Sequence, residues 1–499
     1  MKKFILLILV ISLVIMPMIS MTSCGQDTVD TPATVESPEG GTTPPETPVT
    51  EDDDQNMVVD ELTFPDYLPD IDFDGYTFRV LNTEDGRITW LWTQLTAEEE
   101  TGEALNDAIL RRNRRMEEQF GFELLQVDAT GPGDVHQRAR ISIQAGSDDF
   151  DMAMMTPGYA LRLAQEGMLI SIDTVPYIRL EQPWWDQNMN RDFSIGDRLF
   201  FTSGDFSFNQ YSATIPILFN KVLHANLALD CPYTLVREGR WTLDRFGEMG
   251  RAALMDLSGT GTYDHDDQWG WMAFSHVYVP AVMNGMGAGF IARDADNLPY
   301  LAVNNEHFIT RFLHAVDILS EGWLFDGNQR GMGRPEHIWE EGRSLFWTEL
   351  LNWATTLRAM ENDFGILPMP KFDEAQPHHI SITGLPHVMC IPVTTQNLER
   401  TGIILEALNA ESRLTTLTVY YDTMLVNQIM RDDDSAEMLD IIFEHKVYEI
   451  GRFFWESEVA APIANAMAQG NREIASVIER HYNMATRAIT RTIEAFDNH

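Results

Sequence analysis

Strand-like and helix-like segments alternate along residues 76–167, and this alternation limits the fold more than any other feature of the sequence. The apolar, strand-like runs are YTFRVLNT (76–83), FELLQV (122–127) and FDMAMMT (150–156). The segments that separate and follow them have apolar residues at helical spacing and end at glycines; they cover 104–121, 135–146 and 159–167. Strands joined by helices in this order predict a parallel sheet covered by helices.

The part of the chain available for folding is too long for one hydrophobic core. About 430 residues follow residue 64, whereas single cores stop growing at about 250–300 residues. A polar stretch at 203–214 marks a crossing to a second lobe, and HHISITGLPHVMCIP (378–392) marks the return. From residue 396 the pattern is mostly helical. The sequence therefore predicts two lobes with crossings between them.

The amino terminus has the parts of a secretory signal. Lys2 and Lys3 precede an apolar run at 4–19, and small residues stand just before Cys24. This arrangement is similar to a bacterial lipoprotein signal, which implies a signal peptide at 1–23 and lipid modification of Cys24. An uncleaved membrane anchor is the alternative, although the run barely reaches the ~20 residues that a spanning helix needs. Both interpretations place the protein at the extracellular face of the cell membrane.

The segment 24–63 is rich in Thr, Pro and acidic residues. Such a composition buries too little apolar surface to offset its ordering entropy, so we expect a disordered acidic tether. The whole chain has a formal net charge of −41. This charge disfavours nucleic acid and anionic lipid surfaces as partners, so we expect contact with the membrane through the lipid anchor only.

Several stretches, taken in their order and spacing, resemble segments of the extracellular solute-binding proteins of ATP-driven importers. They are LNDAILRRNRRMEEQFGFEL (105–124), QPWWDQNMNRDFSIGDRLFFTSGD (182–205), LFNKVL (218–223), EGRWTLDRFGEM (238–249) and FGILPMPKFDEAQ (364–376). The chain is similar to the sugar-binding group of that family, which is related to maltose-binding protein.

The resemblance implies a periplasmic-binding-protein-like fold. It has two α/β lobes, each a mainly parallel sheet flanked by helices, and a hinge that lets both lobes close on the solute. We expect lobe 1 at 64–206, lobe 2 at 207–380, a return to lobe 1 at 381–430, and C-terminal helices at 431–499 that pack mainly on lobe 2. The resemblance also implies a monomer that works with the membrane permease of an ABC importer.

Sugar recognition needs flat apolar faces together with polar groups, and the crevice of such folds lies beyond the carboxyl ends of parallel strands. Residues that follow the predicted strands or lie at the first crossing are therefore candidates. So are two of the 12 tryptophans, although most large aromatic residues pack in cores. The predicted solute contacts are Glu84 and Tyr159 after strands, Asn209 and Tyr211 at the crossing, and Trp271 and Trp347.

The loop DLSGTGTYDHDDQWG (256–270) fits the register of a calcium-binding loop, with Gly261 at the turn. The candidate metal ligands are Asp256, Ser258, Thr260, Thr262, Asp264 and Asp267. Ser and Thr stand where Asp or Asn is usual, and Asp stands where a bidentate Glu is expected. A weak structural calcium site is one interpretation; a polar turn that keeps the loop shape is the favoured one. We expect no other cofactor.

The expected function is that of a solute-binding component that captures a carbohydrate, with oligosaccharide as the family default. A ligand-sensing lipoprotein that presents solute to a membrane receptor would have the same fold. An exported glycan-active hydrolase is disfavoured, because no G-x-S-x-G, H-E-x-x-H or Cys/His constellation stands out in the sequence. We therefore expect a binding protein and not an enzyme.

Overall fold

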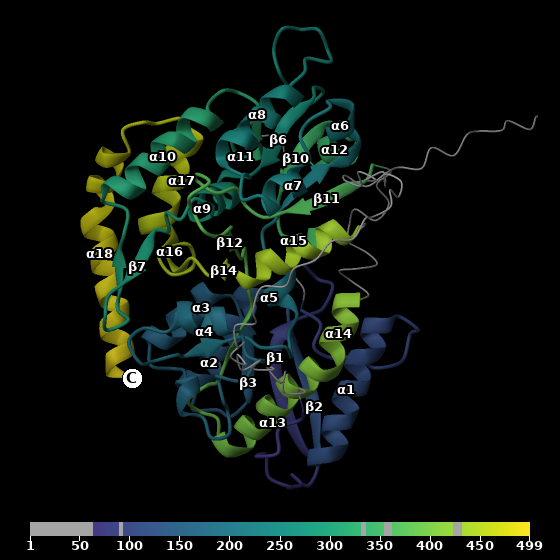
Figure 1. Cartoon of the computed structure of the whole chain (residues 1–499). Coiled ribbons are helices and arrows are strands. Elements are labelled where there is room, and N and C mark those ends of the chain that lie inside the picture. Colours follow the sequence, from purple (N-terminus) through teal and green to yellow (C-terminus); the bar gives the residue numbers. More distant parts are fainter. Residues whose placement is uncertain (1–62, 89–92, 331–335, 354–361, 423–431) are drawn as a thin grey trace, which may run out of the picture. The chain divides into compact units, whose positions relative to one another are not determined.

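The computed structural model describes residues 63–88, 93–330, 336–353, 362–422 and 432–499 (Figure 1). The predicted signal peptide, Cys24 and nearly all of the predicted tether lie outside these described residues. None of the helices within the described ranges combines the length and the apolar character that crossing a membrane requires. From Glu61 onward the chain forms one unit, which contains two separate sheets of 5 strands each.

The first sheet has the strand order β2-β1-β3-β13-β4. Its strands are β1 (Tyr76–Thr83), β2 (Phe122–Ala129), β3 (Met152–Met155), β4 (Phe201–Thr202) and β13 (Val388–Cys390). β1 pairs in parallel with β2 and β3, and Tyr76 lies opposite Phe122. β13 runs antiparallel to both β3 and β4, so a segment from far along the chain returns to this sheet. The parallel pairing predicted for the first three strands is confirmed.

The helices that cover the first sheet are α1 (Ala104–Phe120), α2 (Pro132–Gln144), α3 (Pro157–Gln165), α4 (Gln187–Phe193) and α13 (Leu398–Glu411). α1 shows which terminal residues made a helix predictable from the sequence. α1 is capped at its start by Glu103, whose carboxylate accepts the backbone N–H of Asn106, and at its end by Gly121 with φ 60°. A Cβ at position 121 would meet the carboxylate of Asp72 at 1.8 Å, so glycine is required there for space as well as for backbone conformation.

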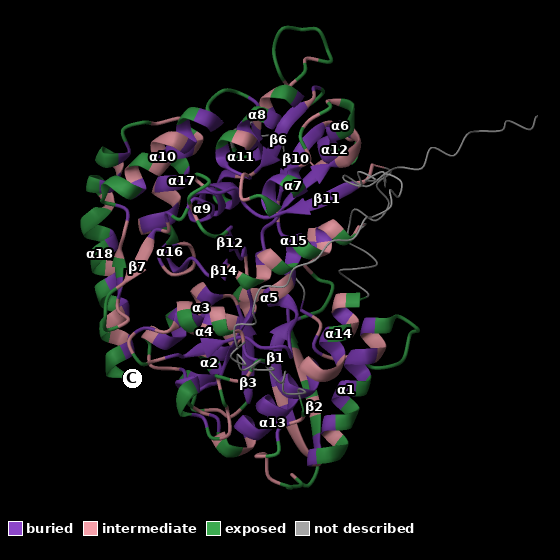
Figure 2. Cartoon of the chain, viewed as in Figure 1, coloured by how far each residue is buried: buried purple, intermediate pink, exposed green. Residues whose placement is uncertain are grey.

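The second sheet has the strand order β11-β5-β10-β6-β9. Its strands are β5 (Ile217–Asn220), β6 (Trp269–Ala273), β9 (Leu324–Asp326), β10 (Ser344–Thr348) and β11 (Phe364–Leu367). β6 pairs in parallel with β10 and β9, while β5 runs antiparallel to β10 and β11. Every residue of β6 and β10 is buried, and Figure 2 shows these strands in the interior of the sheet. The carboxyl ends of β10, β6 and β9 therefore lie at one edge.

Around the second sheet lie α6 (Lys221–Asn226), α7 (Pro232–Arg237), α8 (Leu243–Ala253), α9 (Ser275–Gly285), α10 (Glu306–Leu319), α11 (Gly327–Arg330) and α12 (Glu336–Glu340), with the hairpin β7 (Ile291–Arg293) and β8 (Pro299–Leu301). The helices that follow the return to the first sheet are α14 (Leu417–Tyr420), α15 (Asp433–Glu444), α16 (Ile450–Phe453), α17 (Ala461–Ala468) and α18 (Ile474–Asn498). α17 packs against α9 and α18, and α18 also contacts β8 and α3.

The chain passes between the two sheets through segments that pair with one another. After β4, the short helix α5 (Asn209–Ser212) leads to β5 in the second sheet. The return segment contains β12 (Ser381–Ile382), which pairs in parallel with β14 (Lys446–Val447). The backbone N–H of Ile215 donates to the carbonyl of Ile382 at 2.9 Å, which joins the outgoing and returning segments. These segments form the hinge that the resemblance implied.

Candidate functional site

The carboxyl ends of the parallel strands in the second sheet bring polar side chains to one edge. His276 follows β6, and Asn328 follows β9. The side-chain amide of Asn328 donates to Oγ of Ser275 at 3.0 Å and lies 2.9 Å from Nδ1 of His276. The carboxylate of Asp326 accepts the backbone N–H groups of Ser275 and Asn328. This edge is a connected set of donors and acceptors, which suits a solute that carries hydroxyl groups.

Glu349 follows β10 at the same edge and titrates near neutral pH. Burial raises the pKa of Glu349 to about 7, although the backbone N–H of Leu350 and the charge of Arg452 oppose the change. Burial also lowers the pKa of Arg452 to about 10, with Glu349 opposing. Nη1 of Arg452 donates to the carbonyl of Thr383 at 3.1 Å, which ties this cation to the returning hinge segment. A carboxyl with such a pKa beside a buried cation is typical of a binding or catalytic crevice.

The carboxyl end of β1 supplies polar residues from the first sheet. Glu84 directly follows this strand, is exposed, and pairs with Arg87 at 2.9 Å. Burial raises the pKa of the neighbouring Asp85, whose carboxylate accepts the hydroxyl of Thr93 at 3.3 Å. Glu84 therefore lies at the carboxyl end of the strand, where the sequence predicted it.

A cavity of about 710 Å³ opens between α3 and the segment that follows α16. The lining residues that matter here are Thr156, Tyr159 and Arg162 from α3 and its cap, and Phe453, Phe454 and Trp455 from the C-terminal segment. The guanidinium of Arg162 lies over the ring of Tyr159, 5.4 Å from its centroid. The indole N–H of Trp455 donates to Oγ1 of Thr492 at 3.2 Å. The cavity thus places flat aromatic faces opposite the polar start of a helix, as sugar sites require.

Gly158 lets the two walls of this cavity approach one another. A Cβ at this position would lie 3.0 Å from the carbonyl oxygen of Phe453, which is a backbone atom and cannot swing aside. The first turn of α3 therefore meets the C-terminal segment directly. Any larger residue at position 158 would push the helix start away from the aromatic residues.

The structure places the predicted solute contacts in three different settings. Tyr159 lines the cavity and stacks on His136, with 4.9 Å between ring centroids. Asn209 is buried in the hinge, where its carbonyl oxygen accepts the backbone N–H of His387. Tyr211 is partly buried in the same region and donates from its hydroxyl to Asp205 at 2.8 Å. Asn209 therefore connects the outgoing and returning hinge segments, whereas Tyr211 bonds within the outgoing one.

The two predicted tryptophans are core residues, which corrects their assignment as solute contacts. Trp271 is 0% exposed, and its indole N–H donates to the hydroxyl of Thr348 at 3.0 Å. Trp347 is 1% exposed and packs on Trp339, with ring centroids 5.7 Å apart. The reason is topological: β6 and β10 are central strands covered on both faces, so alternate residues of both strands point into packed layers.

The aromatic wall of the cavity was not among the predicted contacts. Phe453, Phe454 and Trp455 are consecutive, and the first two remain partly exposed. Three adjacent aromatic residues flanked by Arg and Glu in RFFWE are a signal that was available in the sequence. Consecutive side chains point in different directions, so a single core cannot bury all three rings equally.

The predicted calcium loop uses its carboxylates to hold its own backbone. The carboxylate of Asp256 accepts the backbone N–H groups of Gly259 and Gly261 at 2.6 and 2.7 Å. The carboxylate of Asp267 accepts the backbone N–H of Leu257 at 2.9 Å and that of Asp264 at 2.8 Å. These hydrogen bonds lower the pKa of both carboxyl groups. The arrangement supports a self-capped polar turn and leaves calcium binding as a prediction.

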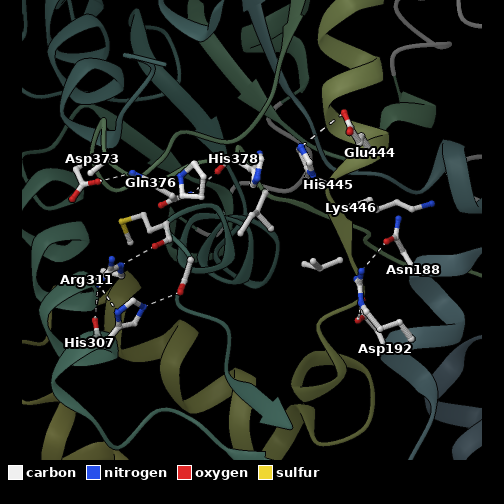
Figure 3. A pocket seen from close by; sticks show the side chains of 17 residues that line it. Asn188, Asp192, His307, Arg311, Asp373, Gln376, His378, Glu444, His445 and Lys446 are labelled. Carbon is white, nitrogen blue, oxygen red and sulfur yellow. Dashed lines mark hydrogen bonds and ion pairs between the residues drawn. The ribbon is translucent and has the colours of Figure 1, made fainter. Parts of the chain in front are cut away.

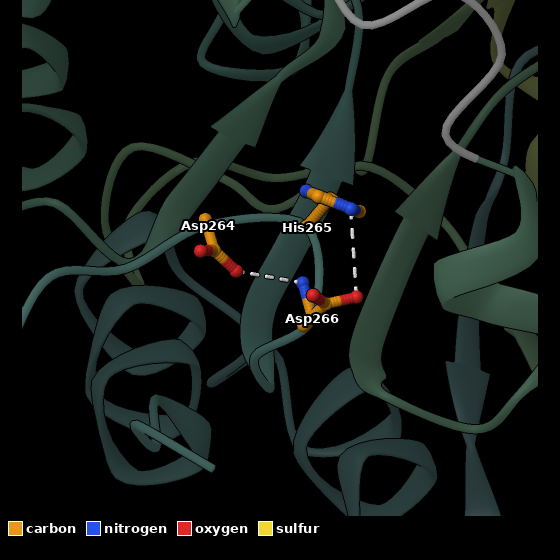
Figure 4. A group of neighbouring side chains, drawn as sticks. All are labelled: Asp264, His265 and Asp266. Carbon is orange, nitrogen blue, oxygen red and sulfur yellow. Dashed lines mark hydrogen bonds and ion pairs between the residues drawn. The ribbon is translucent and has the colours of Figure 1, made fainter. Parts of the chain in front are cut away.

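Three of the remaining groups in this loop gather at one point, as Figure 4 shows. Asp264, His265 and Asp266 bring one potential ligand atom each to within 4.8 Å of one another. His265 and Asp266 are exposed, and the carboxylate of Asp264 accepts the backbone N–H of Asp266 at 2.9 Å. The cluster includes Asp264 from the predicted ligand set, while Ser258, Thr260 and Thr262 bond mainly to one another and to the loop backbone.

Comparison with known proteins adds the class of fold. No family model and no curated protein matches the sequence. Solved structures do match. A cyclic α-maltosyl-1,6-maltose binding protein from Arthrobacter globiformis superposes with a TM-score of 0.55 at 13% identity, covering 84% of this chain and 99% of that one. An ABC substrate-binding protein from Listeria monocytogenes, in complex with cycloalternan, gives 0.54 at 10% identity, covering 83% and 99%.

A third similar structure is UgpB from Mycobacterium tuberculosis in complex with glycerophosphocholine. It gives a TM-score of 0.55 at 13% identity and covers 84% of this chain and 99% of its own. At such identities the likeness concerns the fold. The chain has the two-lobed α/β fold of the ABC solute-binding proteins related to maltose-binding protein, as the sequence predicted, but its two main sheets are mixed and not mainly parallel.

Proposed function

We propose that this protein is the extracellular solute-binding component of an ABC importer and that it captures a carbohydrate, most simply an oligosaccharide, between its lobes. One observation carries the proposal: the cavity between α3 and the C-terminal segment combines an aromatic wall with the polar side chains of Thr156, Arg162 and Gln165. Flat faces for sugar rings and polar groups for hydroxyls are thereby offered together.

The solutes of structurally similar proteins support a carbohydrate. Cycloalternan occupies the Listeria monocytogenes protein, and maltotetraose occupies a cyclo/maltodextrin-binding protein with a TM-score of 0.54 at 12% identity. Glycerophosphocholine in the M. tuberculosis protein is the counterexample within the same fold. We favour the sugar because the cavity of this chain offers the partly exposed rings of Phe453 and Phe454.

The working setting that we propose is a monomer tethered through an acyl group on Cys24 and paired with a membrane permease. The sequence pattern around Cys24 supports the anchor. Mass spectrometry of the mature amino terminus from membranes tests it, because an unmodified or uncleaved terminus would refute the lipid anchor. Capture of a sensor receptor instead of a permease by the solute-loaded protein would favour the signalling role.

Calorimetric titration with linear and cyclic oligosaccharides tests the solute. We expect maltotetraose or a cyclic glucan to bind, and we expect Phe453→Ala to weaken binding by about tenfold through loss of ring stacking. Tyr300→Ala is the matched control, because Tyr300 is an exposed aromatic residue on β8 outside the cavity. Absence of binding across the panel, or equal affinity of Phe453→Ala and the unmodified protein, would contradict the proposal.

A further inference from the structure

A second cavity, of about 740 Å³, lies away from the aromatic wall, beside β14 and between α4 and α10. Figure 3 shows His307 and Arg311 on one side of it and Asn188 and Asp192 on the opposite side. α4 belongs to the first lobe, α10 belongs to the second, and β14 is part of the hinge. The cavity therefore has walls from both lobes and does not include the residues of the proposed sugar site.

Arg311 is held in this cavity by neutral partners. Its Nε donates to the carbonyl of Met286 at 2.8 Å, and its Nη1 lies 2.9 Å from Nδ1 of His307. Nε2 of His307 lies 2.9 Å from the carbonyl of Gly287 and donates to it, so Nδ1 is free to accept from the guanidinium. The guanidinium also lies over the ring of Phe372, 4.3 Å from its centroid. These contacts fix the plane of the guanidinium without neutralising its charge.

The other cations of the cavity already have carboxylate partners. Lys446 pairs with Asp186 at 2.8 Å, and Arg191 pairs with Asp192 at 2.7 Å. Among the described residues, no carboxylate lies within ion-pairing distance of Arg311. Burial lowers the pKa of this arginine, and the charge of Asp373 opposes the shift.

The remaining acids of the lining have other contacts. The carboxylate of Asp373 accepts the backbone N–H of Gln376 at 3.0 Å. Glu444 lies 3.9 Å from the ring of His445. Each of these two carboxylates therefore has a contact other than Arg311. The positive charge of Arg311 is therefore available to a ligand that enters the cavity.

We propose that this cavity is a second ligand site, which binds the carboxylate or phosphate group of a small organic anion at Arg311. A fixed guanidinium plane matches both oxyanions through paired hydrogen bonds. The rings of His378 and His445, tilted by 37° with centroids 4.3 Å apart, line the same cavity and offer a surface for the organic part of the ligand. Because the walls come from both lobes, an anion bound here favours the lobe arrangement that keeps them together.

Titration of the purified full chain with two probes, inorganic phosphate and citrate, tests the proposal at constant ionic strength. We expect saturable binding of at least one probe, and the better probe identifies phosphate or carboxylate as the preferred group. Arg311→Gln should weaken that binding by about tenfold or more, and Arg311→Lys, which keeps the charge but loses the fixed plane, should be intermediate. Arg245→Gln is the control, since Arg245 is an exposed arginine on α8.

Two results would overturn the proposal. One is the absence of saturable binding by both anions to the unmodified protein. The other is equal binding by Arg311→Gln, with far-UV circular dichroism showing that this variant is folded. If Arg311→Gln does not fold, Arg311→Lys decides, because unchanged affinity in that variant excludes recognition by the guanidinium plane. Oligosaccharide titration of the same variants should be unaffected, which separates failure of this site from failure of the proposed sugar site.

Discussion

The ion pair between Lys446 and Asp186 connects the hinge to the first lobe, and its loss should be costly. Lys446 lies on β14, Asp186 caps α4, and their charged atoms are 2.8 Å apart. The two side chains are 4% and 5% exposed, so solvent screens the pair very little. Burial alone would raise the pKa of Asp186, but the charge and hydrogen bond of Lys446 and the hydroxyl of Tyr448 hold it below its usual value.

We predict that Lys446→Met lowers the free energy of unfolding by about 3–5 kcal/mol, because it leaves a buried carboxylate without its cation. We expect a loss in the free energy of unfolding near the lower end of this range, because Tyr448 and the backbone N–H of Met189 still donate to Asp186. Adding Asp186→Asn should recover much of the loss, because Asn is neutral and still caps the helix. Breaking the exposed pair of Arg245 and Glu248 with Arg245→Met should cost less than about 1 kcal/mol.

Urea unfolding at pH 7, followed by tryptophan fluorescence and circular dichroism, measures these differences. The double-mutant cycle isolates the coupling between the two side chains. A loss below about 1 kcal/mol for Lys446→Met would refute the reasoning that the buried pair matters. A double variant that is as unstable as Lys446→Met, or less stable, would refute the explanation through an unpaired buried charge.

Three further predictions concern other parts of the chain. Burial raises the folded-state pKa of Glu349 to about 7, above its unfolded value of about 4.5. The contribution of this carboxyl to the free energy of unfolding is therefore complete below about pH 4.5 and is lost as the pH rises through 7. Glu349→Gln should remove this fall in the free energy of unfolding measured between pH 5 and pH 8. Glu406 accepts both indole N–H groups of Trp184 and Trp185, so Glu406→Leu should cost about 2 kcal/mol or more in urea unfolding by leaving these donors unpaired. Asp267→Ala should lower the melting temperature equally in a chelator and in millimolar calcium, because this carboxylate holds the loop backbone. A melting temperature lowered only in the presence of calcium would support calcium binding by this loop.

Local patterns were sufficient to predict the first three strands of the first sheet and the helices that follow them. The strand predicted at 76–83 is observed over the same residues, and the helix predicted at 104–121 ends where Gly121 takes a left-handed conformation. These segments depend on apolar spacing and on terminal residues, both of which are encoded within a few neighbours. The two-lobed arrangement followed from chain length together with the family resemblance.

The candidate site was predicted only in part, because its residues are brought together by contacts between distant segments. Tyr159 could be placed from its position after a strand, and it does line the cavity. Trp271 could not be assigned correctly, because its burial depends on strands and helices on both sides of the sheet. Lys446 and Asp186 are separated by 260 positions, so no local pattern connects them.

The central claim is that two hinged lobes close on a carbohydrate, and small-angle X-ray scattering tests it most directly. The measurement compares the radius of gyration of the protein alone with that of the protein saturated with an oligosaccharide whose binding has been established by calorimetry. Closure of the lobes around the sugar predicts a smaller radius for the complex. A scattering curve that the bound oligosaccharide leaves unchanged would contradict capture by lobe closure.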